Sequence, residues 1–102
     1  MNIVWTEPAV DSLQAIRDYI ACDNAFYADV FVNRLIDVAE SLNEFPERGR
    51  QVPEAGNPAL RELLFQNYRI IYRHRAGAVE ILAIVHGARD LSRMPRPPWE
   101  AD

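Results

Sequence analysis

The first half of the chain repeats apolar positions with the spacing of helices. Over residues 7–22 apolar side chains recur every three or four positions, with charged residues between them, which predicts an amphipathic helix. Thr6 stands where an N-cap is expected, and an acid and a proline follow in the first turn. Asp23–Asn24 break this helix, and a second apolar stripe extends to about Phe45–Pro46. The two stretches predict an antiparallel helix hairpin.

The remaining periodicity is that of strands. Residues 2–5 are mostly β-branched or aromatic, which predicts a short strand before the helices. Three further strands are predicted after the helices, at residues 60–65, 68–75 and 78–86. Two-residue turns, Gln66–Asn67 and Ala76–Gly77, separate them and are typical of antiparallel hairpins. The order β-α-α-β-β-β predicts an α+β fold, with the N-terminal helix hairpin packed on one face of a mostly antiparallel sheet.

Alternation within residues 68–75 separates two kinds of side chain. One face is expected to belong to the core and carries Tyr68, Ile70, Tyr72 and His74. We therefore interpret the two tyrosines as core aromatics rather than as platforms for stacking bases. The opposite face is expected to be largely exposed and carries Arg69, Ile71, Arg73 and Arg75. The third strand is apolar at every position of 81–85, which indicates a central strand covered on both faces.

Two further segments complete the domain organisation. Residues 46–59 hold three prolines and two glycines, which predicts a long loop. Residues 92–102, with three more prolines, predict an extended or frayed tail after a single domain at 1–91. The longest apolar run, 81–85, is far too short to span a bilayer, and the start of the chain lacks a signal-peptide pattern. A cytoplasmic protein without membrane contact is expected.

Charge is distributed unevenly around the net value of −4. Residues 1–47 contain two arginines and nine acids, whereas residues 48–102 contain nine arginines and six acids. There is no lysine, so every basic side chain is a planar guanidinium. A basic half in an acidic protein indicates an anionic partner, either nucleic acid or an acidic protein segment. The same uneven distribution of charge would also arise if the two halves of the chain attracted each other, or if the basic residues formed a solvated face.

The sequence contains few groups for catalysis. It has no glycine-rich phosphate loop, no His-Glu-x-x-His and no nucleophilic serine motif, and its single cysteine and two histidines are too few for a standard zinc site. No cofactor or metal is expected. Metal-independent RNA cleavage would need proton-transfer groups and cations around the phosphorane. Glu54 and His86 could transfer protons, and Arg61 and Arg69 could stabilise charge. A histidine at the end of a buried strand, such as His86, more often donates a hydrogen bond to a backbone carbonyl than takes part in catalysis.

An ordered set of short motifs resembles a known family. The motifs are Trp5-x-x-x-Ala9, Ile16-x-x-Tyr19-Ile20, FPERGRQVPE, LREL, YRIIYR and VEILAIVHGARD. They lie in order within residues 3–91 and resemble the RelE/ParE toxin superfamily of bacterial type II toxin–antitoxin systems. The resemblance implies a compact toxin, associated with growth inhibition and plasmid stabilisation. It also implies a hetero-oligomer in which the cognate antitoxin wraps the toxin with an amphipathic C-terminal segment.

The superfamily has two functional branches. ParE-like members inhibit DNA gyrase without ribonuclease activity, and RelE-like members cleave mRNA on the ribosome. The motif set and the absence of lysine favour the ParE-like branch, for which no catalytic residue is carried over. The RelE-like alternative would use His86, Glu54, Arg61 and Arg69. A third alternative is a degenerate toxin that still binds its antitoxin but has lost its toxic activity.

The antitoxin is expected to bind the helix hairpin and the arginine-bearing face of the sheet. The expected partner-binding residues are Arg61, Arg69, Arg73 and Arg89.

Overall fold

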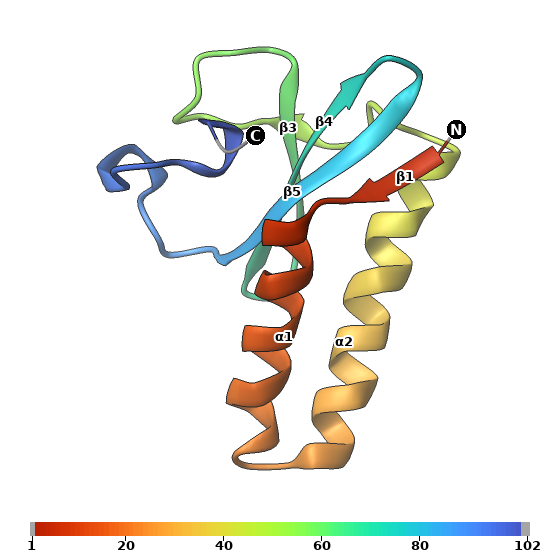
Figure 1. Ribbon diagram of the computed structural model, residues 1–102, viewed down its shortest axis with the longest axis vertical. Coiled ribbons are helices and arrows are strands. Elements are labelled where there is room, and N and C mark those ends of the chain that lie inside the picture. Colours follow the sequence, from red (N-terminus) through yellow and green to blue (C-terminus); the bar gives the residue numbers. More distant parts are fainter. Residues whose placement is uncertain (1, 101–102) are drawn as a thin grey trace.

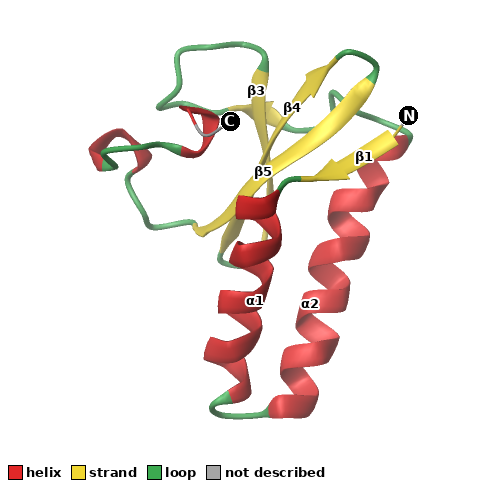
Figure 2. Ribbon diagram, viewed as in Figure 1, coloured by secondary structure: helices red, strands yellow, loops and turns green. Residues whose placement is uncertain are grey.

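Two helices cover one face of a five-stranded sheet in the computed structural model, which describes residues 2–100 (Figures 1 and 2). The elements are β1 (Asn2–Trp5), α1 (Glu7–Ala21), α2 (Ala25–Glu40), β2 (Arg50–Gln51), β3 (Leu60–Phe65), β4 (Tyr68–Arg75) and β5 (Ala78–His86). Three short 3₁₀ helices add η1 (Ser41–Asn43), η2 (Leu91–Arg93) and η3 (Pro98–Glu100). The predicted α+β fold is confirmed. The far end of the helix hairpin projects beyond the sheet (Figure 1).

The strands follow the order β1-β5-β4-β3-β2 across the sheet. β1 pairs with β5 in parallel, and the other neighbours are antiparallel. The bounds predicted for β3, β4 and β5 are confirmed. Ala76 and Gly77 both have positive φ, 55° and 75°, as a two-residue hairpin turn of type I′ requires. The predicted loop contains one strand that alternation did not indicate, because β2 has only two residues.

The helix starts follow their caps. The Thr6 hydroxyl accepts a hydrogen bond from the Ala9 N–H at 3.4 Å, and the Asn24 side chain accepts one from the Tyr27 N–H at 2.9 Å. The Thr6 hydroxyl also donates to the Ile81 carbonyl at 2.7 Å, which fixes the start of α1 against β5. α2 ends earlier than its apolar stripe, at Glu40, and the tighter η1 turn completes it.

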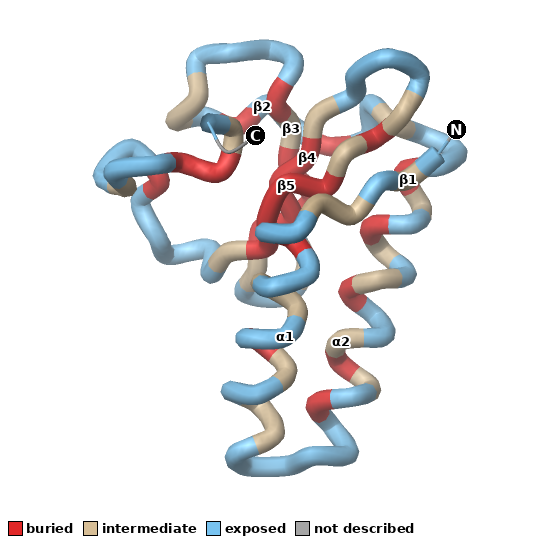
Figure 3. Tube along the Cα trace, in the orientation of Figure 1, coloured by how far each residue is buried: buried red, intermediate tan, exposed pale blue. Residues whose placement is uncertain are grey.

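The main core lies between the helix hairpin and the sheet (Figure 3). Leu35 of α2, Tyr72 of β4 and Ile81 of β5 are fully buried there. The core position predicted for Tyr72 is confirmed, and Tyr68 packs half-buried at the margin of this core. His74 is exposed, so the core position that alternation gave it is wrong, because it lies near the turn that ends β4.

The opposite face of the sheet also carries a core, and the prediction of an open face is wrong at its centre. Five buried residues form this second core: Val52, Leu60, Ile71, Leu82 and Leu91. Met94 and Trp99 pack against them from the C-terminal segment. Residues 92–102 were predicted to be an extended or frayed tail, and fraying is wrong for residues 92–100, because this segment and the loop before β3 bury apolar side chains of β4 and β5 on this face. Residues 101–102 lie outside the described range.

A β-bulge decides which side chains of β5 face the helices. Ile71 pairs with Ala83, but its neighbour Tyr72 pairs with Ile81, so Leu82 is the extra residue. Before the bulge Ile81 faces the helices, and after it Ile84 does, while Leu82 enters the second core. This change of phase brings His86 beside Tyr68, with the two rings 5.7 Å apart.

Candidate functional site

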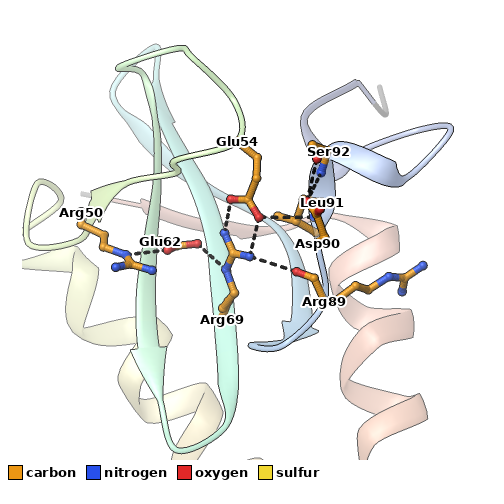
Figure 4. Close-up of polar contacts among 8 residues, drawn as sticks. All are labelled: Arg50, Glu54, Glu62, Arg69, Arg89, Asp90, Leu91 and Ser92. Atoms are coloured by element: carbon orange, nitrogen blue, oxygen red, sulfur yellow. Dashed lines mark hydrogen bonds and ion pairs between the residues drawn. The ribbon is translucent and has the colours of Figure 1, made fainter.

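Arg69 is the centre of an ion-pair network on the face opposite the helices (Figure 4). Its guanidinium donates two hydrogen bonds to the Glu54 carboxylate, from Nη2 to Oε1 at 2.7 Å and from Nη1 to Oε2 at 2.9 Å. Its Nε donates to Glu62 Oε1 at 2.7 Å. Arg69 is only 5% exposed, so the prediction that it points into solvent is wrong. The loop before β3 folds over it and carries Glu54 into reach.

The network continues to other segments. Glu62, which is fully buried, accepts a further hydrogen bond from Arg50 Nε on β2 at 2.6 Å. Glu54 Oε2 accepts one from the Leu91 N–H at 3.3 Å, and Arg69 Nη1 donates to the Arg89 carbonyl at 3.3 Å. Four parts of the chain are therefore tied together: β2, the loop before β3, the paired strands β3 and β4, and the start of the C-terminal segment.

This pairing fixes the charge of Glu54. The hydrogen bonds from Arg69 outweigh the effect of burial and lower the pKa of Glu54 from its ordinary 4.5 to about 2. The same hydrogen bonds raise the pKa of Arg69. At neutral pH Glu54 is therefore ionised, and both of its oxygens are hydrogen-bonded to Arg69. This makes it a poor proton donor or acceptor.

A cleft of about 490 Å³ opens beside the network. His86 lines it together with Arg50, Glu54, Tyr68 and Arg69. The exposed His86 ring accepts a hydrogen bond at Nδ1 from the Ala88 N–H at 3.1 Å, so a neutral ring would carry its proton on Nε2. The interpretation that His86 satisfies a backbone carbonyl is wrong, because its Nδ1 accepts a hydrogen bond from a backbone N–H.

The remaining predicted residues lie apart from this cleft. Arg61 donates to the Gly49 carbonyl at 2.8 Å, and Arg73 pairs with Glu80 at 2.6 Å. The Arg73 hydrogen bond is the main reason that the pKa of Glu80 is lowered. Arg89 is exposed and lines a second groove, on the side of α1. The four arginines expected to bind the partner therefore do not form one exposed face.

Two features of the site escaped the sequence patterns. Glu62 is a buried carboxylate whose only signal was an opposite charge, Arg69, at a nearby position of the next strand. Gly49 passes so close to β3 and β4 that an added Cβ would lie 2.6 Å from both the Glu62 carbonyl oxygen and the Tyr72 hydroxyl. That hydroxyl accepts from the Gly49 N–H at 3.0 Å and donates to the Pro46 carbonyl at 2.8 Å.

Within residues 2–100 the protein has neither a cluster of metal-ligating side chains nor a helix that could span a membrane. No three His, Cys, Asp or Glu side chains in this range converge to hold a metal ion. No helix in it is long and apolar enough to cross a membrane.

The chain belongs to the ParE toxin family of type II toxin–antitoxin systems. The model of this family, described as the ParE toxin of type II toxin–antitoxin system, parDE, matches residues 3–91. Toxin RelE2 of Caulobacter vibrioides is 42% identical over 89 residues, which cover 86% of this chain and 97% of that protein. The resemblance to the RelE/ParE superfamily is thus confirmed, and the chain is the toxin component of such a system.

Solved structures agree with this assignment at the level of the fold. A chain of the chromosomal ParDE system from P. aeruginosa has a TM-score of 0.72 at 24% identity, over 84% of this chain and 95% of that one. A chain of the RelBE2 toxin–antitoxin complex from Mycobacterium tuberculosis has a TM-score of 0.61 at 20% identity, over 86% and 92%. The similar proteins carry names from both branches of the superfamily.

Proposed function

We propose that this chain is a ParE-like toxin that inhibits DNA gyrase by binding it and that a cognate antitoxin neutralises it. The match to the ParE family supports this branch. The observation that carries the proposal is the mutual neutralisation of Glu54 and Arg69, because it takes two of the four candidate catalytic residues out of use and leaves His86 as the only one of the four that is exposed in the cleft.

A metal-independent ribonuclease needs a base and an acid close to the reacting phosphate, with cations that are free to stabilise new charge. Glu54, with a pKa of about 2, is committed to Arg69. The Arg69 cation is committed to two carboxylates, and Arg61 is held at a backbone carbonyl outside the cleft. Of the four candidate catalytic residues, only His86 both lines the cleft and is exposed.

The alternative function is a RelE-like, ribosome-dependent mRNA endoribonuclease. It is favoured by His86, which lines the cleft together with the half-exposed Arg50, and by the similarity to a toxin named RelE2. In this alternative His86 would transfer a proton and Arg50 would bind phosphate.

A supercoiling assay tests the proposal. Purified toxin is added to gyrase and relaxed plasmid, with and without the antitoxin encoded by the neighbouring gene. We expect toxin to block supercoiling or to trap cleaved DNA, antitoxin to relieve the block, and His86→Ala to retain full inhibition. Normal supercoiling at saturating toxin would overturn the proposal.

Toe-printing of mRNA on translating ribosomes tests the alternative. New cleavage in the ribosomal A site that disappears in His86→Ala would establish the ribonuclease. A toxin that neither blocks gyrase nor cleaves mRNA, but still binds antitoxin, would be degenerate.

The four arginines expected to bind the partner can do so in different ways. Arg89 is on the surface, and Arg61 and Arg73 are half-buried, so these three can contact an acidic segment directly. Arg69 is buried and would act by holding Glu54, and with it the loop before β3, in place.

A further inference from the structure

The far end of the helix hairpin exposes large aromatic side chains. This end, residues 18–27, joins α1 to α2 and projects beyond the sheet, and we call it the hairpin tip (Figures 1 and 3). Tyr19 is 78% exposed, Phe26 is 79% exposed and Tyr27 is 49% exposed. Single exposed apolar residues are common on soluble proteins, but a cluster of them marks a binding surface.

The aromatic side chains of the two helices flank the same part of the core. The Tyr27 ring lies 6.0 Å from that of Phe31, and Phe31 lies 5.7 Å from Tyr68. Tyr19 is close to Tyr68 as well, since the pKa of Tyr68 is raised mainly by burial and further by Tyr19. Phe26 adjoins Tyr27 and continues the aromatic surface around the end of α2. The exposed rings therefore form a cluster.

The hairpin tip is held in a fixed shape. Arg17 Nε of α1 donates to Asp29 Oδ1 of α2 at 2.8 Å, which ties the two helices together. The N–H groups of Asp23 and Asn24 both donate to the Ile20 carbonyl, at 3.0 and 3.1 Å, and close the end of α1. A surface that already has its bound shape loses less conformational entropy when a partner docks.

The helix hairpin is also strongly acidic. Residues 7–40 contain seven acids and two arginines, a formal net charge of −5. Arg17 is paired with Asp29, so the exposed Asp18 and Asp23 give the hairpin tip a negative charge. An aromatic surface bordered by carboxylates is complementary to a basic surface with apolar pockets, and repels an acidic one.

This complementarity favours gyrase over other partners. An enzyme that binds duplex DNA needs an extended basic surface, because the phosphates must be neutralised. An acidic segment, which the basic half of the toxin would attract, is repelled by the hairpin tip. A second copy of the toxin would bring a hairpin tip of the same charge and is disfavoured for the same reason.

We propose that the hairpin tip is the part of the toxin that docks on gyrase. Its three exposed aromatic side chains enter apolar pockets, and Asp18 and Asp23 face basic side chains of the enzyme. The inference rests on the proposed function and names the surface that performs it. The cleft lies outside this surface, which agrees with the expectation that His86→Ala retains full inhibition.

Removal of the exposed rings tests the site in the supercoiling assay. We expect the double variant Tyr19→Ser with Phe26→Ser to need at least about tenfold more toxin for half-inhibition. Phe45→Ser removes a 63% exposed ring outside the hairpin tip and should stay within about twofold of wild type. Equal inhibition by the double variant would overturn the site alone. Wild-type toxin that does not inhibit gyrase would overturn the proposed function.

The same double variant distinguishes gyrase from the antitoxin as the partner at this surface. We expect its affinity for the antitoxin, measured by calorimetry, to stay within about twofold of wild type, which also shows that it folds. Full gyrase inhibition together with antitoxin binding weakened about tenfold would assign the hairpin tip to the antitoxin and overturn the proposal.

Charge reversal tests the basic character of the partner surface. Asp23→Arg should slow association with gyrase about tenfold at low salt, and the difference should shrink as salt is added. Asp37→Arg makes the same charge change at an exposed position of α2 outside the hairpin tip, and should have a much smaller effect. Equal effects would show that only the overall charge matters and would overturn the assignment to a basic surface.

Cross-linking reports the contact directly. Cys22, the single cysteine, is exposed in the hairpin tip. A photo-activated cross-linker attached to it should join the toxin covalently to gyrase. The same label at position 44, in a Cys22→Ser and Glu44→Cys variant, should give at least about fivefold less product, because that position lies outside the hairpin tip. Absence of product from the Cys22 label, in toxin that still inhibits supercoiling, would overturn the site.

Discussion

Arg69 carries a permanent positive charge in a position that hardly reaches solvent. The cost of burying that charge is offset by three short hydrogen bonds to two carboxylates. Removal of one carboxylate therefore leaves a buried cation partly unpaired. At the scale of the residue, the network stabilises the fold and also immobilises the groups that seemed available for catalysis.

The first prediction concerns Glu54→Gln. We expect the free energy of unfolding at pH 7 to fall by about 1–3 kcal/mol, because the amide cannot replace the ionised partner of Arg69. Urea unfolding of the variant and of wild type measures the difference. Glu44→Gln, at an exposed position outside the network, is the matched control and should change little.

The second prediction concerns how the stability difference between wild type and Glu54→Gln depends on pH. The pKa of Glu54 is about 2 in the folded protein and returns to its ordinary 4.5 in the unfolded chain. A carboxyl with a lowered folded pKa stabilises the protein above its unfolded pKa, and this stability is lost as pH falls through the folded value. The difference between wild type and Glu54→Gln should therefore be full at pH 7 and vanish towards pH 2. A difference that stays constant from pH 7 to pH 3 would contradict this account.

At the scale of the element, Thr6 joins three parts of the structure. Its main chain continues β1 with the hydrogen bond to Ile81, and its hydroxyl caps α1 and bonds to the same carbonyl. We expect Thr6→Ala to lower the free energy of unfolding by about 1–2 kcal/mol, since the cap and a contact to β5 are lost together. Ser12→Ala removes only a hydroxyl bonded within α1 and should cost less in the same thermal unfolding experiment. Equal losses would mean that the junction has no special role.

At the scale of the whole molecule, the C-terminal segment acts as a cover for the second core. Leu91 is fully buried, and Met94 and Trp99 pack against the same cluster. A chain shortened to end at Asp90 should lose about 2–5 kcal/mol of stability and bind more of a hydrophobic dye, because the second core becomes exposed. A chain that ends at Glu100 is the control. Identical urea midpoints for both would show that the segment does not stabilise the sheet.

Much of the fold could be predicted because its signals are local. The bounds of β3, β4 and β5 followed from alternation and two-residue turns, and the start of α1 followed from Thr6. The burial of Arg69 could not be predicted in this way, because its partner Glu54 lies fifteen residues away in a loop without periodicity. The phase of β5 could not be predicted either, because the bulge at Leu82 arises only when β4 and β5 are paired.

The sequence by itself determined the order of the elements, the helix hairpin, the core position of Tyr72 and the motif set that the family match confirmed. Only the tertiary structure decided which arginines are paired, that the C-terminal segment covers the sheet, and that the hairpin tip projects beyond it (Figure 1). The physical reason is one of range. Periodicity and caps act between residues a few positions apart, whereas ion pairs, covered faces and projecting ends depend on segments that meet only after folding.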